Sequence, residues 1–164
     1  MVPKSLHVCY LCNEYPPAGI VGGIGIFTQT IARGLVDTGH RVTVVGLYEQ
    51  SKEYVEDVDR GVRIIRLSAR ARYIKLGWLI NRYRMLSTVR RLIENENVDI
   101  VEAPDYEGLF WLAPRWRIPR VVRLHGSEVY FRRLLNEPLK LKHLVAERSS
   151  LYNANAIGSV SKYT

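Results

Sequence analysis

Short apolar runs alternate along the chain with longer segments in which apolar residues recur at helical spacing. Runs of the first kind, such as LHVCYLC and RVTVVGL, predict buried strands, and segments of the second kind predict amphipathic helices. The strands expected in this way are residues 6–12, 41–47, 62–67, 98–104, 120–126 and 156–161. The helices expected between them are residues 25–40 and 78–94, a short helix within 106–113 and a longer one within 138–153.

Strands that alternate with helices indicate an α/β fold with a mostly parallel sheet. We expect a Rossmann-like sheet of order 3-2-1-4-5-6 with helices on both faces, in a single domain over residues 1–164. One connection departs from this pattern, because the polar and partly acidic YEQSKEYVEDVDRG (48–61) predicts a loop and no helix. The third strand can therefore run in either direction. No helix follows the last strand, so we expect the chain to be the first half of a longer protein.

Composition limits the class of protein. The net charge of +8 and a pI of about 9.7 favour partners that carry phosphate or carboxylate groups. No apolar run approaches the roughly 18 residues that a membrane span needs, and no signal sequence is evident, so we expect a cytoplasmic protein. The cysteines, Cys9 and Cys12, fall on a strand that points them to opposite sides, which favours two buried thiols over a redox pair or a zinc site.

In open α/β sheets, ligands bind beyond the carboxyl ends of the strands. Four loops should meet there: the glycine-rich loop after the first strand, APDYEG (103–108), HGSE (125–128) and SKYT (161–164). Polar and small residues dominate all four loops. We therefore expect the functional residues of the chain in these loops.

The glycine-rich loop EYPPAGIVGGIG ends where the first helix begins. A helix N-terminus offers unpaired N–H groups and suits a phosphate, although a loop that merely needs positive φ angles would look similar. The glycines Gly19, Gly22, Gly23 and Gly25 do not match the dinucleotide fingerprint GxGxxG, and Glu49 follows the second strand too late to hold a ribose. An NAD(P)-dependent oxidoreductase is therefore the weaker alternative.

The stretch EYPPAGIVGGIGIFTQTIARGLVDTGHRVTVVG resembles the opening of nucleotide-sugar glycosyltransferases of the two-Rossmann-domain (GT-B) class, in particular glycosyltransferase family 4. VDIVEAPDYEG is similar to the fourth strand of that family, VVRLHGSEVY to its fifth strand with a histidine, and NANAIGSVSKYT to its sixth. The resemblance runs in order across essentially the whole chain. It implies an N-terminal domain that holds the acceptor and faces a C-terminal domain that holds most of the nucleotide sugar.

The resemblance also implies roles for single residues. It places His125 beside the transferred sugar, where an imidazole can bond a hydroxyl or a phosphate, although a histidine that only ends a strand would look the same. The other implied residues are the donor-phosphate-binding Gly22, Gly23 and Gly25 and the acceptor-binding Glu102, Asp105 and Tyr106. The resemblance implies retention of anomeric configuration, no metal and no cofactor, since the nucleotide sugar is a co-substrate. The donor-binding half is missing, so the fragment alone should be inactive.

A basic segment stands apart from these loops. Ten Lys or Arg residues and no Asp or Glu occur from Arg60 to Ile93. Aromatic residues among the basic ones are compatible with three kinds of segment: a helix that lies in an anionic membrane interface, a segment that binds a nucleic-acid strand, or an ordinary surface helix. The residues expected to contact an anionic surface are Arg70, Arg72, Lys75, Trp78, Arg82 and Arg84. Many family 4 enzymes use lipid-linked acceptors, so the resemblance favours docking on the inner face of the cell membrane over nucleic-acid binding.

The leading prediction is the N-terminal, acceptor-binding domain of a retaining glycosyltransferase that uses a nucleotide-sugar donor and a saccharide or lipid-linked acceptor. The alternatives are an NAD(P)-dependent Rossmann oxidoreductase domain and a basic, non-enzymatic module that binds membranes or nucleic acid.

Overall fold

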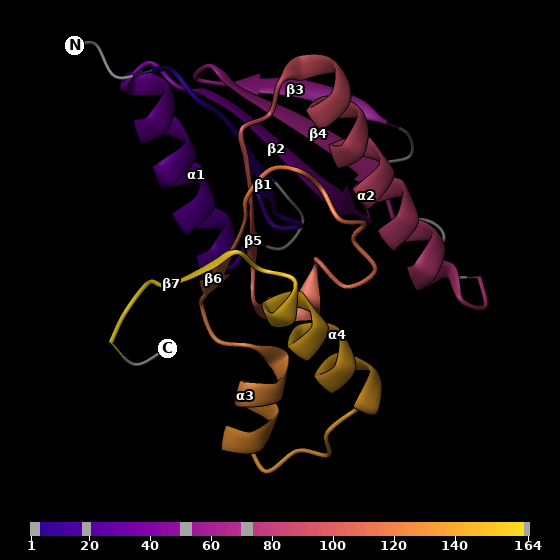
Figure 1. Cartoon of the computed structure of the whole chain (residues 1–164). Helices are drawn as coiled ribbons and strands as arrows, with labels where there is room; N and C mark the ends of the chain where they lie inside the picture. The colour runs from indigo at the N-terminus through magenta and orange to yellow at the C-terminus, as the bar shows by residue number, and fades with distance from the viewer. Residues whose placement is uncertain (1–3, 18–20, 50–53, 70–73, 163–164) are drawn as a thin grey trace. The chain divides into compact units, whose positions relative to one another are not determined.

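The computed structural model of the chain describes residues 4–17, 21–49, 54–69 and 74–162 (Figure 1). The chain divides into two compact units, Met1–Val101 (unit 1) and Glu102–Thr164 (unit 2). Strand β5 (Ile100–Pro104) runs through the boundary between them. The single domain expected from the sequence therefore stays a prediction.

Unit 1 contains a sheet whose strands follow the order β3-β4-β2-β1. Strand β1 pairs in parallel with β2, and β2 pairs in parallel with β4, so the third strand expected from the sequence is parallel to the first two. Every residue of β1 is buried, as expected for a strand covered on both faces. The bounds are β1 His7–Leu11, β2 Arg41–Tyr48, β3 Val55–Asp59 and β4 Val62–Ser68.

Strand β3 lies in the segment that was predicted to be a loop, so that prediction was wrong. It pairs antiparallel with β4 through a two-residue turn in which Arg60 and Gly61 both have positive φ, 47° and 82°. Such a turn matches the twist of a hairpin. The strand was missed because its residues are mostly exposed and acidic, which is typical of an edge strand that resists further pairing.

Two helices pack on the sheet of unit 1, α1 (Gly23–Asp37) and α2 (Gly77–Glu96), and Figure 1 shows them on opposite sides of it. Ala32 of α1 belongs to a buried cluster that also contains Cys12. Cys9 and Cys12 are both free and fully buried, and burial raises the pKa of the Cys9 thiol to about 12. The predicted buried thiols are therefore confirmed.

Unit 2 orders its strands β5-β6-β7, and β6 pairs in parallel with β7. Helix α4 confirms the helix expected within residues 138–153, whereas the segment expected to form a short helix within 106–113 is reduced to the 3-10 turn η2. Helix α3 was not expected from the sequence, and its N-cap Ser127 accepts the N–H of Tyr130. The bounds are η2 Tyr106–Gly108, β6 Arg120–Leu124, α3 Glu128–Leu134, α4 Leu141–Tyr152 and β7 Ala156–Ser159.

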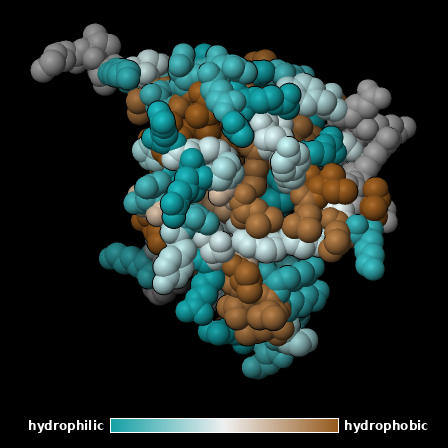
Figure 2. Space-filling view, turned by 45° about the vertical axis from the view of Figure 1, so that its right-hand side comes forward, coloured by the Kyte–Doolittle hydropathy of each residue, from teal (hydrophilic) through white to brown (hydrophobic). Residues whose placement is uncertain are grey.

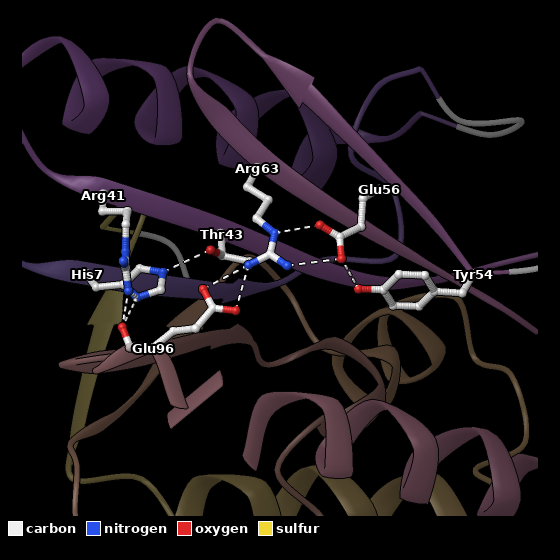
Figure 3. A network of polar contacts seen from close by, with 7 residues as sticks. All are labelled: His7, Arg41, Thr43, Tyr54, Glu56, Arg63 and Glu96. Atoms are coloured by element: carbon white, nitrogen blue, oxygen red, sulfur yellow. Dashed lines mark hydrogen bonds and ion pairs between the residues drawn. The ribbon is translucent and has the colours of Figure 1, made fainter. Parts of the chain in front are cut away.

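A polar network ties the amino ends of the strands of unit 1 to the end of α2 (Figure 3). Arg63 bonds both oxygens of Glu96, at 2.7 and 2.8 Å, and both oxygens of Glu56, at 2.8 and 3.0 Å. At the starts of β1 and β2, Arg41 Nη2 lies 2.6 Å from His7 Nδ1. An open pocket of about 380 Å³ lies between β3, β4 and α2 and is partly lined by Arg63 and Glu96. Within unit 1, this network lies at the amino ends of β1, β2 and β4, and the glycine-rich loop follows the carboxyl end of β1.

The predicted fold class is confirmed. The strands form a mostly parallel α/β arrangement, and the order within each unit, β4-β2-β1 and β5-β6-β7, agrees with the expected 3-2-1 and 4-5-6. The extra strand β3 is an addition at the outer edge of unit 1.

Candidate functional site

The glycine-rich loop of unit 1 leads from β1 into α1. Gly22 is the N-cap residue of α1, with an extended backbone and no side chain to satisfy the first N–H groups of the helix. Its own N–H donates to Glu14 Oε2 at 3.1 Å. The N-terminus of α1 thus already binds a carboxylate, as expected for the positive end of a helix dipole. Gly19 lies outside the described residues.

The three glycines that were expected to bind phosphate differ in their surroundings. A Cβ on Gly25 would overlap the backbone carbonyl of Glu14, with the carbonyl carbon only 2.8 Å away, and a Cβ on Gly22 would overlap the Glu14 side chain. A Cβ on Gly23 would meet nothing within 4 Å. Gly25 is therefore required by its close contact with the Glu14 backbone, whereas a Cβ on Gly22 would displace only the flexible end of the Glu14 side chain. Gly23 faces open space from which a ligand can approach.

Glu14 is a site residue that the sequence reasoning missed. It lies in the quoted loop, eight residues before Gly22, and spacing alone gave no reason to bring its carboxylate back to the helix. The available signal was an acidic side chain in a loop that leads to a helix N-terminus. The carboxylate now occupies an N–H group that we expected to be available to a phosphate.

In unit 2, Asp105 and His125 lie together as expected for residues of adjacent loops. The Asp105 carboxylate accepts the backbone N–H of His125 at 2.9 Å and that of Gly126 at 3.3 Å. The Asp105 N–H donates to the carbonyl of Arg123 at 2.9 Å. Because the buried Asp105 carboxylate accepts two consecutive N–H groups, it holds the backbone of the histidine loop in place.

The His125 imidazole is half-buried at the end of this loop. Burial lowers its pKa from the usual value, Asp105 and Glu102 act to raise it, and Arg123 acts to lower it. The ring is therefore neutral at pH 7, with one nitrogen that donates and one that accepts a hydrogen bond. A neutral imidazole suits a sugar hydroxyl, which can both donate and accept.

Glu102 has a different environment from the one expected for a free acceptor-binding carboxylate. It is buried, and Arg123 bonds both of its oxygens, Nε to Oε1 at 2.9 Å and Nη2 to Oε2 at 3.0 Å. Tyr106 begins the turn η2 and is only partly exposed. The acceptor-binding roles of Glu102, Asp105 and Tyr106 stay predictions, and the structure adds positioning contacts for two of these residues.

A second buried carboxylate supports the same loop from α4. Glu147 accepts the N–H groups of Glu128 at 2.8 Å and Val129 at 3.3 Å, which start α3. Burial raises its pKa, and the nearby Asp105 acts in the same direction. Sequence reasoning missed Glu147, because nothing in the helical pattern of α4 indicates which of its polar residues turns inward.

The basic segment is only partly described, since Arg70 and Arg72 lie outside the described residues. Lys75 and Trp78 are exposed near the start of α2. Arg84 is half-buried and donates to the Ser68 carbonyl at 2.9 Å, and Arg82 is also half-buried. Among the described residues, none of the helices combines the length and apolar character that a membrane span requires.

A Rossmann-like α/β chain with its polar loops at the carboxyl ends of the strands belongs to the class of folds from which GT-B glycosyltransferases are built. The profile of the glycosyl transferase 4-like domain family matches residues 22–164. This chain therefore belongs to that family, and the predicted family membership is confirmed.

Two known proteins illustrate the relationship. An uncharacterized glycosyltransferase from Methanocaldococcus jannaschii is 28% identical over 127 residues, which cover 76% of this chain and 32% of the relative. The solved structure of sucrose-phosphate synthase from Thermosynechococcus elongatus matches with a TM-score of 0.71 at 15% identity, over 93% of this chain and 41% of that one. The likeness to the synthase confirms the GT-B type of fold. The chain spans about a third of the length of the curated relative.

Proposed function

We propose that this chain is the N-terminal domain of a retaining glycosyltransferase that transfers a sugar from a nucleotide-sugar donor to a saccharide or lipid-linked acceptor. Family membership supports the transfer of a sugar. The observation that carries the proposal is the start of α1, where the N-cap residue has no side chain to cap the helix and the space around Gly23 is open. The alternatives, an oxidoreductase and a non-enzymatic module, have no support of this kind.

In this proposal the start of α1 stabilises the diphosphate of the donor. The leaving group gains negative charge as the glycosidic bond breaks, and fixed N–H groups with the helix dipole are suited to stabilise it. The carboxylate of Glu14 would have to give up its bond to the Gly22 N–H for a phosphate to take its place. Binding of the donor is then coupled to a movement of this one side chain.

His125 takes the role of a hydrogen-bonding group for the transferred sugar. Its ring is kept neutral by burial, and its backbone is held by the buried Asp105. Such a fixed, neutral imidazole can orient a hydroxyl in the transition state at little entropic cost. The experiment that tests this role is substitution in the full-length protein.

His125→Ala should reduce sugar transfer at least tenfold, measured as release of nucleoside diphosphate from a panel of UDP-, GDP- and ADP-sugars. His40→Ala is the matched control, because His40 stands just before the amino end of β2, outside the loops proposed to bind the substrates, and its loss should leave the rate nearly unchanged. A thermal unfolding curve checks that both variants fold. Equal rates for the two variants would remove His125 from the reaction.

We also propose that the protein works in the cytoplasm, docked on the inner face of the membrane, where a lipid-linked acceptor is available. Apolar side chains are exposed near the start of α2, and Figure 2 shows hydrophobic surface there. They are Ile74, Leu76, Trp78 and Ile80, with relative exposures of 61%, 58%, 40% and 46%. Lys75 stands among them, and apolar side chains with a basic residue are typical of an interfacial helix.

Co-sedimentation with vesicles tests the membrane proposal. Binding to vesicles that contain phosphatidylglycerol should be lost in a Lys75→Glu plus Trp78→Ser variant and kept in an Arg90→Gln variant. Arg90 is a suitable control, because it is exposed on the same helix but paired with Glu94. Equal sedimentation of both variants, or of the natural protein without vesicles, would exclude docking through this segment.

A further inference from the structure

The guanidinium of Arg120 is buried and has no negative partner among the residues that the structure describes. Arg120 is the first residue of β6, and only 8% of its surface is exposed. Its single side-chain hydrogen bond runs from Nη1 to the Pro114 carbonyl at 3.4 Å, and within the described part of the chain Nε has no partner. Burial lowers the pKa of this guanidinium, and the positive charge of the nearby Arg115 acts in the same direction.

A second buried donor, Trp116, lies four residues before Arg120, in the connection between η2 and β6. Trp116 packs edge-on against the buried ring of Phe110, with 6.2 Å between the ring centroids. Its indole Nε1–H is buried and has no acceptor among the residues that the structure describes. Native proteins rarely leave such donors unpaired, so the Arg120 Nε–H and the Trp116 Nε1–H, four residues apart in the sequence, indicate that an acceptor binds here.

The connection also carries an excess of positive charge. Leu109 to Ser127 contains no Asp or Glu. Arg123 of this stretch is paired with Glu102, while Arg115 and Arg117 are exposed beside Trp116. Arg115, Arg117 and Arg120 therefore leave three positive charges without an acidic partner among the described residues. A doubly charged anion balances such a site better than a single carboxylate does.

The backbone at Arg120 is held by hydrogen bonds to Asn155, which fixes the point from which the side chain starts. The Arg120 N–H donates to Asn155 Oδ1 at 3.0 Å, and the Asn155 N–H donates to the Arg120 carbonyl at 2.8 Å. Parallel pairing of β6 with β7 continues from the next residue. A guanidinium carries its N–H groups in one plane, in an arrangement that matches two oxygens of a phosphate.

We infer that Arg120 and Trp116 form a binding site for a phosphate group at the amino end of β6. The guanidinium supplies the charge and at least one N–H, and the indole supplies a further N–H. Arg115 and Arg117 attract the anion from the surface. The site is separate from the one proposed above, because His125 follows the carboxyl end of β6 and five residues of strand separate the two by about 16 Å.

Thermal unfolding of the full-length protein tests this site with inorganic phosphate as the probe. In a phosphate-free buffer, sodium phosphate should raise the Tm by several degrees more than sodium chloride at the same ionic strength, since binding to the folded state alone stabilises it. Arg120→Met should abolish this rise. It should also leave the Tm unchanged or higher without phosphate, because it removes a buried charge that lacks a partner.

Arg148→Gln is the matched control, since Arg148 is exposed on α4 and its loss changes the net charge equally. This variant should keep the full response to phosphate. Trp116→Phe keeps an aromatic ring and removes only the N–H, so it should raise the Kd for phosphate at least threefold, and it tests the site even if the Arg120 variant fails to fold. No difference between phosphate and chloride in the natural protein, or equal responses in all variants, would overturn the inference.

A second experiment, with vesicles that contain phosphatidic acid, distinguishes a lipid headgroup from a soluble phosphate as the ligand. Binding of vesicles that depends on Arg120 assigns a lipid headgroup, and a response to inorganic phosphate alone assigns a soluble ligand. His125→Ala should leave either response intact. The phosphate site and the transferase site can therefore fail independently of each other.

Discussion

The carboxylate of Glu14 accepts the backbone N–H of Gly22 at 3.1 Å, at the N-terminus of α1 where we propose that the donor diphosphate binds. A carboxylate at this position stabilises the helix, by about 0.3–1 kcal/mol for a typical helix end. It also competes with any other anion for the same N–H group.

Glu14→Ala should strengthen binding of a nucleoside diphosphate by the full-length protein several-fold, because it frees an N–H group and removes a negative charge. The free energy of unfolding should fall slightly at the same time. Calorimetric titration with UDP, GDP and ADP measures the first effect, and urea denaturation measures the second. Weaker binding in the variant would show that Glu14 shapes the loop for the donor and does not compete with it.

The three glycines of the loop should respond differently to alanine. Gly25→Ala forces a Cβ into the Glu14 carbonyl and should lower the free energy of unfolding by about 1–3 kcal/mol, which is the usual cost of overpacking. Gly23→Ala is its matched control, because the space at Gly23 is open and alanine favours the helix. Urea denaturation of both variants measures the difference. Equal stability of the two would contradict the close contact at Gly25.

Breaking the ion pair of Glu102 and Arg123 should lower the free energy of unfolding mainly because one buried charge is left without its partner. Arg123→Met leaves the buried Glu102 carboxylate unpaired and should cost roughly 2–3 kcal/mol, less than a fully buried pair because Arg123 is partly exposed. The double variant with Glu102→Leu should recover most of that loss. A double-mutant cycle by chemical denaturation measures the coupling, and strictly additive effects would mean that the pair is energetically unimportant.

His7 should make the stability depend on pH. Burial is the main cause that lowers its pKa from 6.5, and Arg41 acts in the same direction. Below pH 6.5 the unfolded chain takes up a proton at His7 that the folded chain does not, so the free energy of unfolding falls as the pH decreases. The slope from this one group is at most about 1.4 kcal/mol per pH unit.

Urea denaturation at pH 7.5 and pH 5.5 measures this effect. His7→Gln should be less sensitive to pH than the natural protein, because glutamine keeps polar contacts near Thr43 but does not titrate. His40→Gln serves as the control for loss of a histidine at the same edge of unit 1. If His7→Gln keeps the full dependence on pH, another group is responsible.

The fold class could be predicted because it depends on local patterns that repeat. Fully buried parallel strands are continuous apolar runs such as HVCYL, and helices between them show their buried stripe directly in the sequence. Strand β3 and helix α3 could not be predicted in this way. Strand β3 is polar because it is an exposed edge, and α3 buries no residue completely, so neither leaves an apolar pattern.

The candidate site also has a part that could be predicted from local patterns and a part that could not. The loops after the strands, and with them His125 and the glycines, could be predicted because parallel strands bring their carboxyl ends to one edge. The partners of these residues could not be predicted. Glu14 reaches Gly22 only through the path of its loop, and Glu147 reaches α3 only because α4 packs beside it.

The sequence by itself therefore predicted the α/β class with the order of six strands, the family and the loops in which ligands are expected, since these follow from periodicity and short motifs. Only the tertiary structure decided which side chains in those loops are already bound by the protein. It pairs Glu102 with Arg123 and bonds Asp105 to the backbone of the histidine loop. It leaves Arg120 buried with no countercharge in the described part of the chain. The physical reason is that hydrogen bonds and burial depend on residues that are distant in the sequence, and no local pattern encodes which of them meet.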